Sequence, residues 1–327
     1  MKATARAPSN VALVKYWGKR DRRLNLPATG SISVTLDGLE TVTTVAFDRA
    51  LDADTCTIDG TADPRGARRV LAFLDLVRTR FGVTEHARVR SRNDFPTGAG
   101  LASSASGFAA LTVAIDAALG LGLSREELSA LARRGSGSAA RSLIDGFAEM
   151  RAGTAEDGSD AFAVALGPPD LCPMDVLAVV TTHQPKAVGS TEGMERTERT
   201  SPYYRAWVEQ TLADLDAMRE ALRASDLERV GTIAEENAMR MHAAMLASSP
   251  PLLYWNGTTL DVVREVARLR QGGEGAWVTI DAGPQVKVLC APGRGEHVAA
   301  RIEAVGGVLA ILRSRPGRGA HVVEDAA

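Results

Sequence analysis

The stretch FPTGAGLASSASGFAAL, at positions 95 to 111, passes from a run of Gly, Ala and Ser residues directly into an apolar helical pattern. Gly98 and Gly100 carry no side chain that would keep a ligand away from the backbone. A helix that begins near Ala102 would present unpaired N–H groups and the positive end of its dipole to this loop. These features are typical of a phosphate-binding loop.

Three serines follow in the same stretch, and their hydroxyl groups can bind phosphate oxygens or a magnesium ion: Ser103, Ser104 and Ser106. The loop matches neither the Walker pattern G-x-x-x-x-G-K-[ST] nor a strand-led G-x-G-x-x-G, so a Walker loop and a dinucleotide site are both poor matches. Small residues also allow a helix to pack tightly against a sheet. On these residues alone, phosphate binding and close helix packing both stay open.

The chain of 327 residues is 45% hydrophobic, which is enough for one large core or two ordinary ones. Its formal net charge of -2 and pI near 6.3 give no electrostatic reason to expect binding to nucleic acid or to an acidic membrane. Cys56, Cys172 and Cys290 lie far apart, which indicates neither a disulfide framework nor a zinc site and favours a reducing cytoplasm. We see no apolar run near the roughly 18 residues of a membrane span and no signal peptide, and expect the mature chain to begin at Met1.

Lysine is rare in this chain. Among 38 basic residues, five are lysine: Lys2, Lys15, Lys19, Lys186 and Lys287. In a chain so biased towards Arg, a lysine can mark a site where a compact ammonium group is needed and a guanidinium would not fit. Chance is the alternative explanation.

Alternation and helical periodicity predict the elements of the first half of the chain. Positions 30 to 48 read as two strands joined near Asp37-Gly38. Helices are expected over 67 to 81, 103 to 119 and 124 to 133, and Ser124 with Glu127 forms a capping box for the last of them.

The turn-rich segment GPPDLCP, at positions 167 to 173, separates two expected domains, 1–172 and 173–327. In the second we expect strands near 174 to 181, 276 to 280, 285 to 290 and in VGGVLAIL, with helices around Leu212 to Leu222, 226 to 246 and 258 to 271. Strands and helices mix without strict βαβ alternation, so the sequence predicts an α+β fold rather than a doubly wound sheet.

The pattern P-x-G-x-G-L-x-S-S-A-S resembles the nucleotide loop of the GHMP kinase superfamily. Further motifs make the chain similar to one branch, diphosphomevalonate decarboxylase: APSNVALVKYWGKRDRRLNLPATGSISVTL (7 to 36), RRGSGSAARSL (133 to 143), GSTEGMERTERTSP (189 to 202), ENAMRMHAAMLASSPPLLYW (236 to 255) and TIDAGPQVKVL (279 to 289). The resemblance implies the two-domain GHMP kinase fold, with an N-terminal nucleotide-binding domain like domain 2 of ribosomal protein S5 and a C-terminal ferredoxin-like α/β sandwich.

The resemblance also implies a reaction. ATP with Mg²⁺ would phosphorylate the tertiary alcohol of 5-diphosphomevalonate, and loss of that phosphate and of carbon dioxide would give isopentenyl diphosphate. Alternatives are a decarboxylase for the monophosphate, a small-molecule kinase that stops at the phosphorylated alcohol, and a non-catalytic metabolite-binding module. The family further implies a cytoplasmic homodimer.

ATP binding is implied for the opening stretch and one lysine: Pro96, Gly98, Gly100, Leu101, Ala102, Ser103, Ser104, Ser106 and Lys186. Ser104 is the expected contact of Mg²⁺, which would be held through the phosphates. For Lys186, an ordinary solvated loop lysine is the alternative.

Substrate binding is implied for a second set: Tyr16, Trp17, Lys19, Ser136, Gly137, Ser138, Arg141, Ser190 and Thr191. The fixed donors of the Arg141 guanidinium match a carboxylate in a bidentate pair, whereas an unremarkable surface arginine is the alternative. Ser190 and Thr191 are expected on a glycine-bounded loop, and Trp17 is expected to pack as a wall.

The expected catalytic residues are Asp281, Lys15, Arg141 and Ser104. Asp281 opens Asp-Ala-Gly-Pro after a strand, and by itself this pattern favours an aspartate that only forms a turn. The resemblance instead makes it the group that orients or deprotonates the substrate hydroxyl, kept ionised by Lys15. No histidine is needed, and His242 is expected to be structural.

Overall fold

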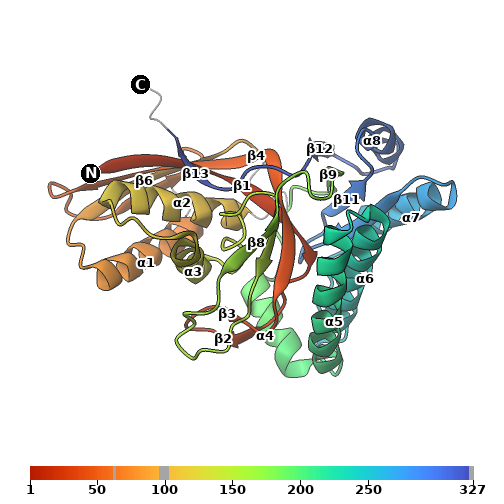
Figure 1. The fold of residues 1–327 in the computed structure, drawn as a ribbon, viewed down its shortest axis with the longest axis horizontal. Helices are drawn as coiled ribbons and strands as arrows, with labels where there is room; N and C mark the ends of the chain where they lie inside the picture. Colours follow the sequence, from red (N-terminus) through yellow and green to blue (C-terminus); the bar gives the residue numbers. More distant parts are fainter. Residues whose placement is uncertain (62–63, 96–102, 324–327) are drawn as a thin grey trace.

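The computed structural model describes residues 1–61, 64–95 and 103–323. Two sheets lie side by side, with helices on their faces (Figure 1). The first sheet has the order β13-β1-β4-β6-β5, and β7 pairs with β4 and β8. Its strands are β1 (Lys2–Val14), β4 (Ser31–Asp48), β5 (Thr55–Ile58), β6 (His86–Asn93), β7 (Phe147–Met150), β8 (Ala163–Gly167) and β13 (His321–Val323). A small hairpin, β2 (Lys19–Asp21) and β3 (Leu26–Pro27), lies apart from it.

Three helices cover one face of the first sheet (Figure 1): α1 (Pro64–Phe81), α2 (Ser103–Leu119) and α3 (Arg125–Gly135). The central helix, α2, is apolar around almost its whole circumference because it packs on β1 and β4 on one side and beside α3 on another. Phe73 of α1 meets Phe108 of α2 edge to face, with ring centroids 5.4 Å apart. This packing fixes the N-terminal end of α2 beside the sheet.

The second sheet is antiparallel throughout and has the order β10-β11-β9-β12. Its strands are β9 (Asp175–Val180), β10 (Ala276–Ile280), β11 (Val286–Cys290) and β12 (Ala310–Ser314). The helices of this half are α4 (Ser190–Thr200), α5 (Tyr204–Arg223), α6 (Leu227–Leu246), α7 (Gly257–Gln271) and α8 (Gly295–Glu303). Helix α6 contacts both β1 and β10, so it joins the two sheets through a shared apolar core.

The predicted α+β class is confirmed, and so are the helices expected over 67 to 81, 103 to 119 and 124 to 133. The capping box is present, because the Ser124 hydroxyl accepts from the Glu127 N–H and the Glu127 carboxylate accepts from the Ser124 N–H. None of the helices in the described residues is both long and apolar enough to span a membrane.

Positions 30 to 48 do not form two strands, as the turn-like Asp37-Gly38 suggested, but the single strand β4. The pairing of β4 with β1 shifts its register between Pro8 and Asn10, and Gly38 takes a φ of 70° within the irregular part. The strand continues because β1 runs along both of its halves. The Asp37-Gly38 dipeptide therefore marks a bulge within one strand rather than the turn of a hairpin.

The end of the chain returns to the first sheet, since β13 pairs with β1 through Thr4↔Val323 to Arg6↔His321. Residues beyond Ser314 thus pack with the N-terminal half, although they lie within the segment 173–327 expected to form the second domain. The division at 172 and 173 stays a prediction.

Gly231 of α6 faces the indole of Trp277 in β10 so closely that an added Cβ would overlap the ring. We therefore expect Gly231→Ala to lower the free energy of unfolding by about 1–3 kcal/mol, because the two sheets meet through this helix. Urea unfolding measures the change. The matched control is Gly257→Ala at the start of α7, where an added Cβ meets nothing within 4 Å and stability should be kept. Equal losses in both variants would contradict the packing argument.

Candidate active site

One carboxylate and two ammonium groups meet where the two sheets approach each other. Asp281 follows β10, Lys15 follows β1, and Lys287 lies within β11. Lys15 Nζ donates to Asp281 Oδ1 at 2.8 Å, and Lys287 Nζ lies 3.3 Å from Asp281 Oδ2. Both lysines are almost fully buried, whereas the Asp281 side chain is 33% exposed. The carboxylate is therefore held on both oxygens yet open on one side.

Burial opposes ionisation of Asp281, but the charges and hydrogen bonds of Lys15 and Lys287 outweigh it and hold the pKa of the carboxyl well below its usual range. Burial lowers the pKa of Lys15, and Asp281 counteracts this effect. At neutral pH Asp281 is a carboxylate. A group with so low a pKa suits charge stabilisation and orientation of a hydroxyl better than full removal of its proton.

Lys15 is positioned by groups from both halves of the chain. Its ammonium donates to the Ala12 carbonyl at 2.9 Å, and its backbone N–H donates to Asn237 Oδ1 of α6 at 2.8 Å. Asn237 in turn donates to Asp214 of α5 at 2.8 Å. This buried network fixes the end of β1 against the second half of the molecule.

Arg141 is buried beside this cluster. Its guanidinium donates to Ser31 Oγ at 2.6 Å and to Asn10 Oδ1 at 3.3 Å. Its Nε has no hydrogen-bond partner among the described residues. Burial lowers the pKa of Arg141 to about 10, partly offset by Asp281 and Tyr16, so the group stays cationic at neutral pH. A buried cation with donor capacity to spare is suited to an anionic ligand.

Three serine hydroxyls form a chain towards the N-terminal end of α2. Ser104 Oγ lies 3.3 Å from Ser136 Oγ, which lies 3.2 Å from Ser138 Oγ. The aromatic ring of Tyr16 covers Gly137, where an added Cβ would come within 2.7 Å of the Tyr16 hydroxyl. The structure thus brings together residues that we predicted separately for ATP and for substrate.

Trp17 is buried and meets Tyr254 edge to face at 6.4 Å, as expected of a packing wall. Lys19 lies on β2, and burial lowers its pKa despite the attraction of Glu195. Ser190 and Thr191 do not lie on a loop: they begin helix α4, and Gly189 is its N-cap. The glycine-bounded stretch therefore marks a helix start.

Lys186 donates to Ser190 Oγ at 2.7 Å and to the Ala282 carbonyl at 3.0 Å, next to Asp281. The structure thus brings it to the Asp281 side of the site. Ser106, by contrast, is fully buried, and its hydroxyl pairs with Thr41 Oγ1 at 2.7 Å inside the protein.

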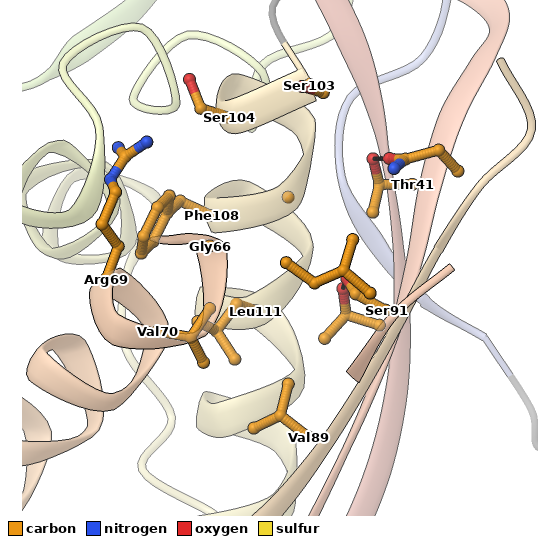
Figure 2. A pocket seen from close by; sticks show the side chains of 14 residues that line it. Thr41, Gly66, Arg69, Val70, Val89, Ser91, Ser103, Ser104, Phe108 and Leu111 are labelled. Atoms are coloured by element: carbon orange, nitrogen blue, oxygen red, sulfur yellow. Dashed lines mark hydrogen bonds between the residues drawn. The ribbon is translucent and has the colours of Figure 1, made fainter. Parts of the chain in front are cut away.

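A cavity of about 270 Å³ lies between α1, α2 and the first sheet, beside the N-terminal end of α2 (Figure 2). Ser103 and Ser104 stand at one end of it, and apolar side chains such as Val70, Phe108 and Leu111 line it. Arg69 lies at its rim, with its guanidinium 4.9 Å from the centre of the Phe108 ring. The cavity has the size and lining that suit an aromatic base.

Comparison with known proteins identifies the family. The model of the diphosphomevalonate decarboxylase-like N-terminal domain matches residues 7–163, and that of the mevalonate 5-diphosphate decarboxylase C-terminal domain matches 176–309. The chain belongs to the diphosphomevalonate decarboxylase family.

Individual relatives agree with this assignment. The chain is 36% identical to a diphosphomevalonate decarboxylase of Ganoderma lucidum (93% of this chain, 81% of the relative) and 39% identical to one of Gibberella zeae (86% and 79%). Among solved structures it is similar to mevalonate diphosphate decarboxylase from Enterococcus faecalis (37% identity, TM-score 0.91, 99% of both chains) and Staphylococcus aureus (36%, TM-score 0.92, 99% and 98%). The predicted GHMP kinase fold is confirmed.

Five of the residues predicted to bind ATP lie outside the described residues: Pro96, Gly98, Gly100, Leu101 and Ala102. Their roles stay predictions. His242 is buried beside Trp255, with ring centroids 4.5 Å apart, and burial lowers its pKa to about 3. It is therefore neutral at physiological pH, as expected of a structural histidine.

Sequence reasoning missed Lys287, Asn10 and Ser31. The scarcity of lysine pointed to Lys287, but it gave no partner for it. Asn10 and Ser31 lie within the quoted decarboxylase-like motif, yet nothing in their local pattern indicates contact with an arginine more than 100 residues away. Only the fold shows that these three side chains support Asp281 and Arg141.

Proposed function

We propose that this protein carries out the ATP-dependent decarboxylation of mevalonate 5-diphosphate, releasing ADP, phosphate and carbon dioxide, and that the cluster around Asp281 is its catalytic centre. The observation that carries the proposal is the charge imbalance there. Three buried cations, Lys15, Lys287 and Arg141, surround one carboxylate. Burying excess positive charge is costly unless an anionic ligand joins it, and the substrate brings a carboxylate and a diphosphate.

The substrate can be oriented by its two anionic ends. Arg141 would bind the carboxylate, with Asn10 and Ser31 holding the guanidinium in place. The diphosphate would lie against Ser136, Ser138, Tyr16 and Lys19, with Ser190 and Thr191 at the start of α4 as further donors. This arrangement leaves the tertiary hydroxyl between Asp281 and the nucleotide side of the site, which the serine chain connects to Ser104.

The chemistry follows from this arrangement. The C3 hydroxyl oxygen, oriented by Asp281, attacks the γ-phosphorus and releases its proton to solvent, and ADP leaves with the electrons of the broken P–O bond. The new phosphate then departs from C3 with its bonding pair, and the carbon left behind is electron-poor. The C1–C2 bond breaks, its electrons form the C2=C3 double bond, and carbon dioxide leaves. The carboxylate of Asp281 stabilises the electron-poor carbon electrostatically.

ATP would bind in the first half of the molecule, beside helix α2. The cavity beside Ser103 and Ser104 would take the base and ribose of ATP, and the N-terminal end of α2 would face its phosphates. A bound Mg²⁺ would neutralise the charge of the ATP phosphates. The Ser104 hydroxyl would bind these phosphates and in this way help to hold the ion. One solved relative is a complex with MVAPP, AMPPCP and magnesium, which supports the use of ATP and Mg²⁺.

We also propose that the protein is a cytoplasmic homodimer. The three cysteines lie far apart along the chain and are buried, which supports a reducing compartment: Cys56, Cys172 and Cys290. Resemblance to the family supports the dimer.

The first test is the reaction itself. With ATP and Mg²⁺, we expect carbon dioxide and ADP to form in equal amounts from 5-diphosphomevalonate, with kcat/KM at least about tenfold above that for 5-phosphomevalonate, because the site offers more donors than one phosphate uses. Coupled ADP assay and trapped carbon dioxide measure both products. ADP without carbon dioxide would favour the kinase alternative, and equal kcat/KM values would remove the preference for the diphosphate.

Asp281→Asn keeps the size of the side chain and deletes its charge. We expect a folded protein with unchanged affinity for ATP and a kcat lowered by about 10³-fold, because transition-state charge loses its partner. Steady-state kinetics and nucleotide titration measure the two effects. The control is Asp157→Asn, where an exposed turn aspartate accepts from the Ser159 N–H, and kcat should not change. A kcat within about tenfold of wild type for Asp281→Asn would refute the catalytic role.

Ser104→Ala should lower kcat by about 10²-fold with little change in the KM of the decarboxylation substrate, because its hydroxyl would act on the phosphates of ATP and the magnesium ion. Ser124→Ala is the control: it removes the cap of α3, so it should reduce stability by about 1 kcal/mol and leave kcat unchanged. A near-normal kcat for Ser104→Ala would exclude this serine from the mechanism.

A further inference from the structure

Lys287 is placed beside Asp281 by the geometry of the β10–β11 hairpin. In the antiparallel pair, Lys287 lies directly opposite Thr279, and Asp281 comes two residues after Thr279. Residues in such diagonal positions are close enough for long side chains to meet across the two strands. The resulting distance from Lys287 Nζ to Asp281 Oδ2 is 3.3 Å.

The two lysines at Asp281 are held differently. Lys15 lies just past the end of β1, whereas Lys287 is the second residue of β11, which pairs with β10 on one side and β9 on the other. Its side chain is 2% exposed. The backbone that carries this side chain is fixed by two ladders of hydrogen bonds, and burial restricts the side chain itself, so Lys287 is well placed to orient a partner.

We propose that Lys287 is a positioning residue for the decarboxylation, which holds the second oxygen of Asp281 and thereby fixes the plane of the carboxylate against the C3 hydroxyl of the substrate. The inference rests on the proposed function of Asp281. Lys15 alone, at Oδ1, would leave the carboxylate free to rotate about that contact. With both oxygens held, the lone pairs that remain face the open side of the site, where the substrate hydroxyl would lie.

Other ionisable groups also act on Asp281. Lys15 approaches from the end of β1, Arg141 from the segment after α3, and Lys186 from the segment before α4, while the neutral His242 approaches from α6. Unlike these four residues, Lys287 lies in the same hairpin as Asp281. Its removal leaves Lys15 and Arg141 in place, so the pKa of Asp281 should rise without the carboxyl losing all of its stabilisation.

Lys287→Met tests the proposal, because methionine keeps most of the length of the apolar stem and removes the charge. We expect kcat to fall by about 10- to 100-fold while the KM values for ATP and substrate stay within about threefold, since the anion contacts are kept. Lys287→Gln should give the same loss and replaces the methionine variant if that variant does not fold. A wild-type kcat in a folded variant would overturn the proposal.

The split between kcat and KM separates positioning from a purely structural role. The matched control is Val288→Ala, the next residue of β11, which should reduce stability and leave the kcat of the folded enzyme unchanged. A kcat loss in Val288→Ala as large as that in Lys287→Met would show that the loss reflects damage to β11, and it would contradict the proposal.

A double-mutant cycle with Asp281→Asn completes the test. If Lys287 acts through Asp281, adding Lys287→Met to Asp281→Asn should change kcat by less than about twofold. The same fold loss in both backgrounds would show that Lys287 acts elsewhere. If wild type releases no carbon dioxide, the proposed function itself fails. If wild type is active and Lys287→Met matches it, this inference alone fails.

Discussion

The ion pair between Lys15 and Asp281 joins residues 266 positions apart and links the two halves of the chain. It forms because the end of β1, in the first sheet, is held against α6 by Asn237, and because β10 ends at the same place. Helix α6 therefore contributes to the core and also sets the position of Lys15 relative to Asp281. Any shift between the two sheets would separate the Asp281 carboxylate from a lysine that keeps it ionised.

The same junction collects positive charge that the protein does not neutralise by itself. Lys15, Lys287 and Arg141 are buried near one carboxylate, although desolvation lowers the pKa of both Lys15 and Arg141. Such an arrangement stabilises the folded chain poorly, since buried cations without full compensation are costly. It is suited to a substrate that carries a carboxylate and phosphates, because each anion that enters relieves the imbalance.

Small residues join the start of α2 to the segment after α3. Ser104 at the first turn of α2 and Ser136 and Ser138 after α3 form one chain of hydroxyls, and Gly137 allows the Tyr16 ring to lie directly on this loop. A larger side chain at position 137 would displace the ring. The glycine of this loop thus reflects how closely the Tyr16 ring approaches the backbone.

The sequence alone determined the features that depend on neighbours along the chain. Helical periodicity gave α1, α2 and α3, the capping box gave the start of α3, and the motifs indicated the family, ATP and Asp281. The tertiary structure decided the features that depend on distant segments. It joined positions 31 to 48 into one strand because β1 pairs with both halves of it, and it brought β13 back to the first sheet. It also brought Lys287 into contact with Asp281, and Asn10 into contact with Arg141. Local patterns cannot contain these contacts, because a side chain's partner across a sheet or between sheets is set by register and packing, which only the complete fold supplies.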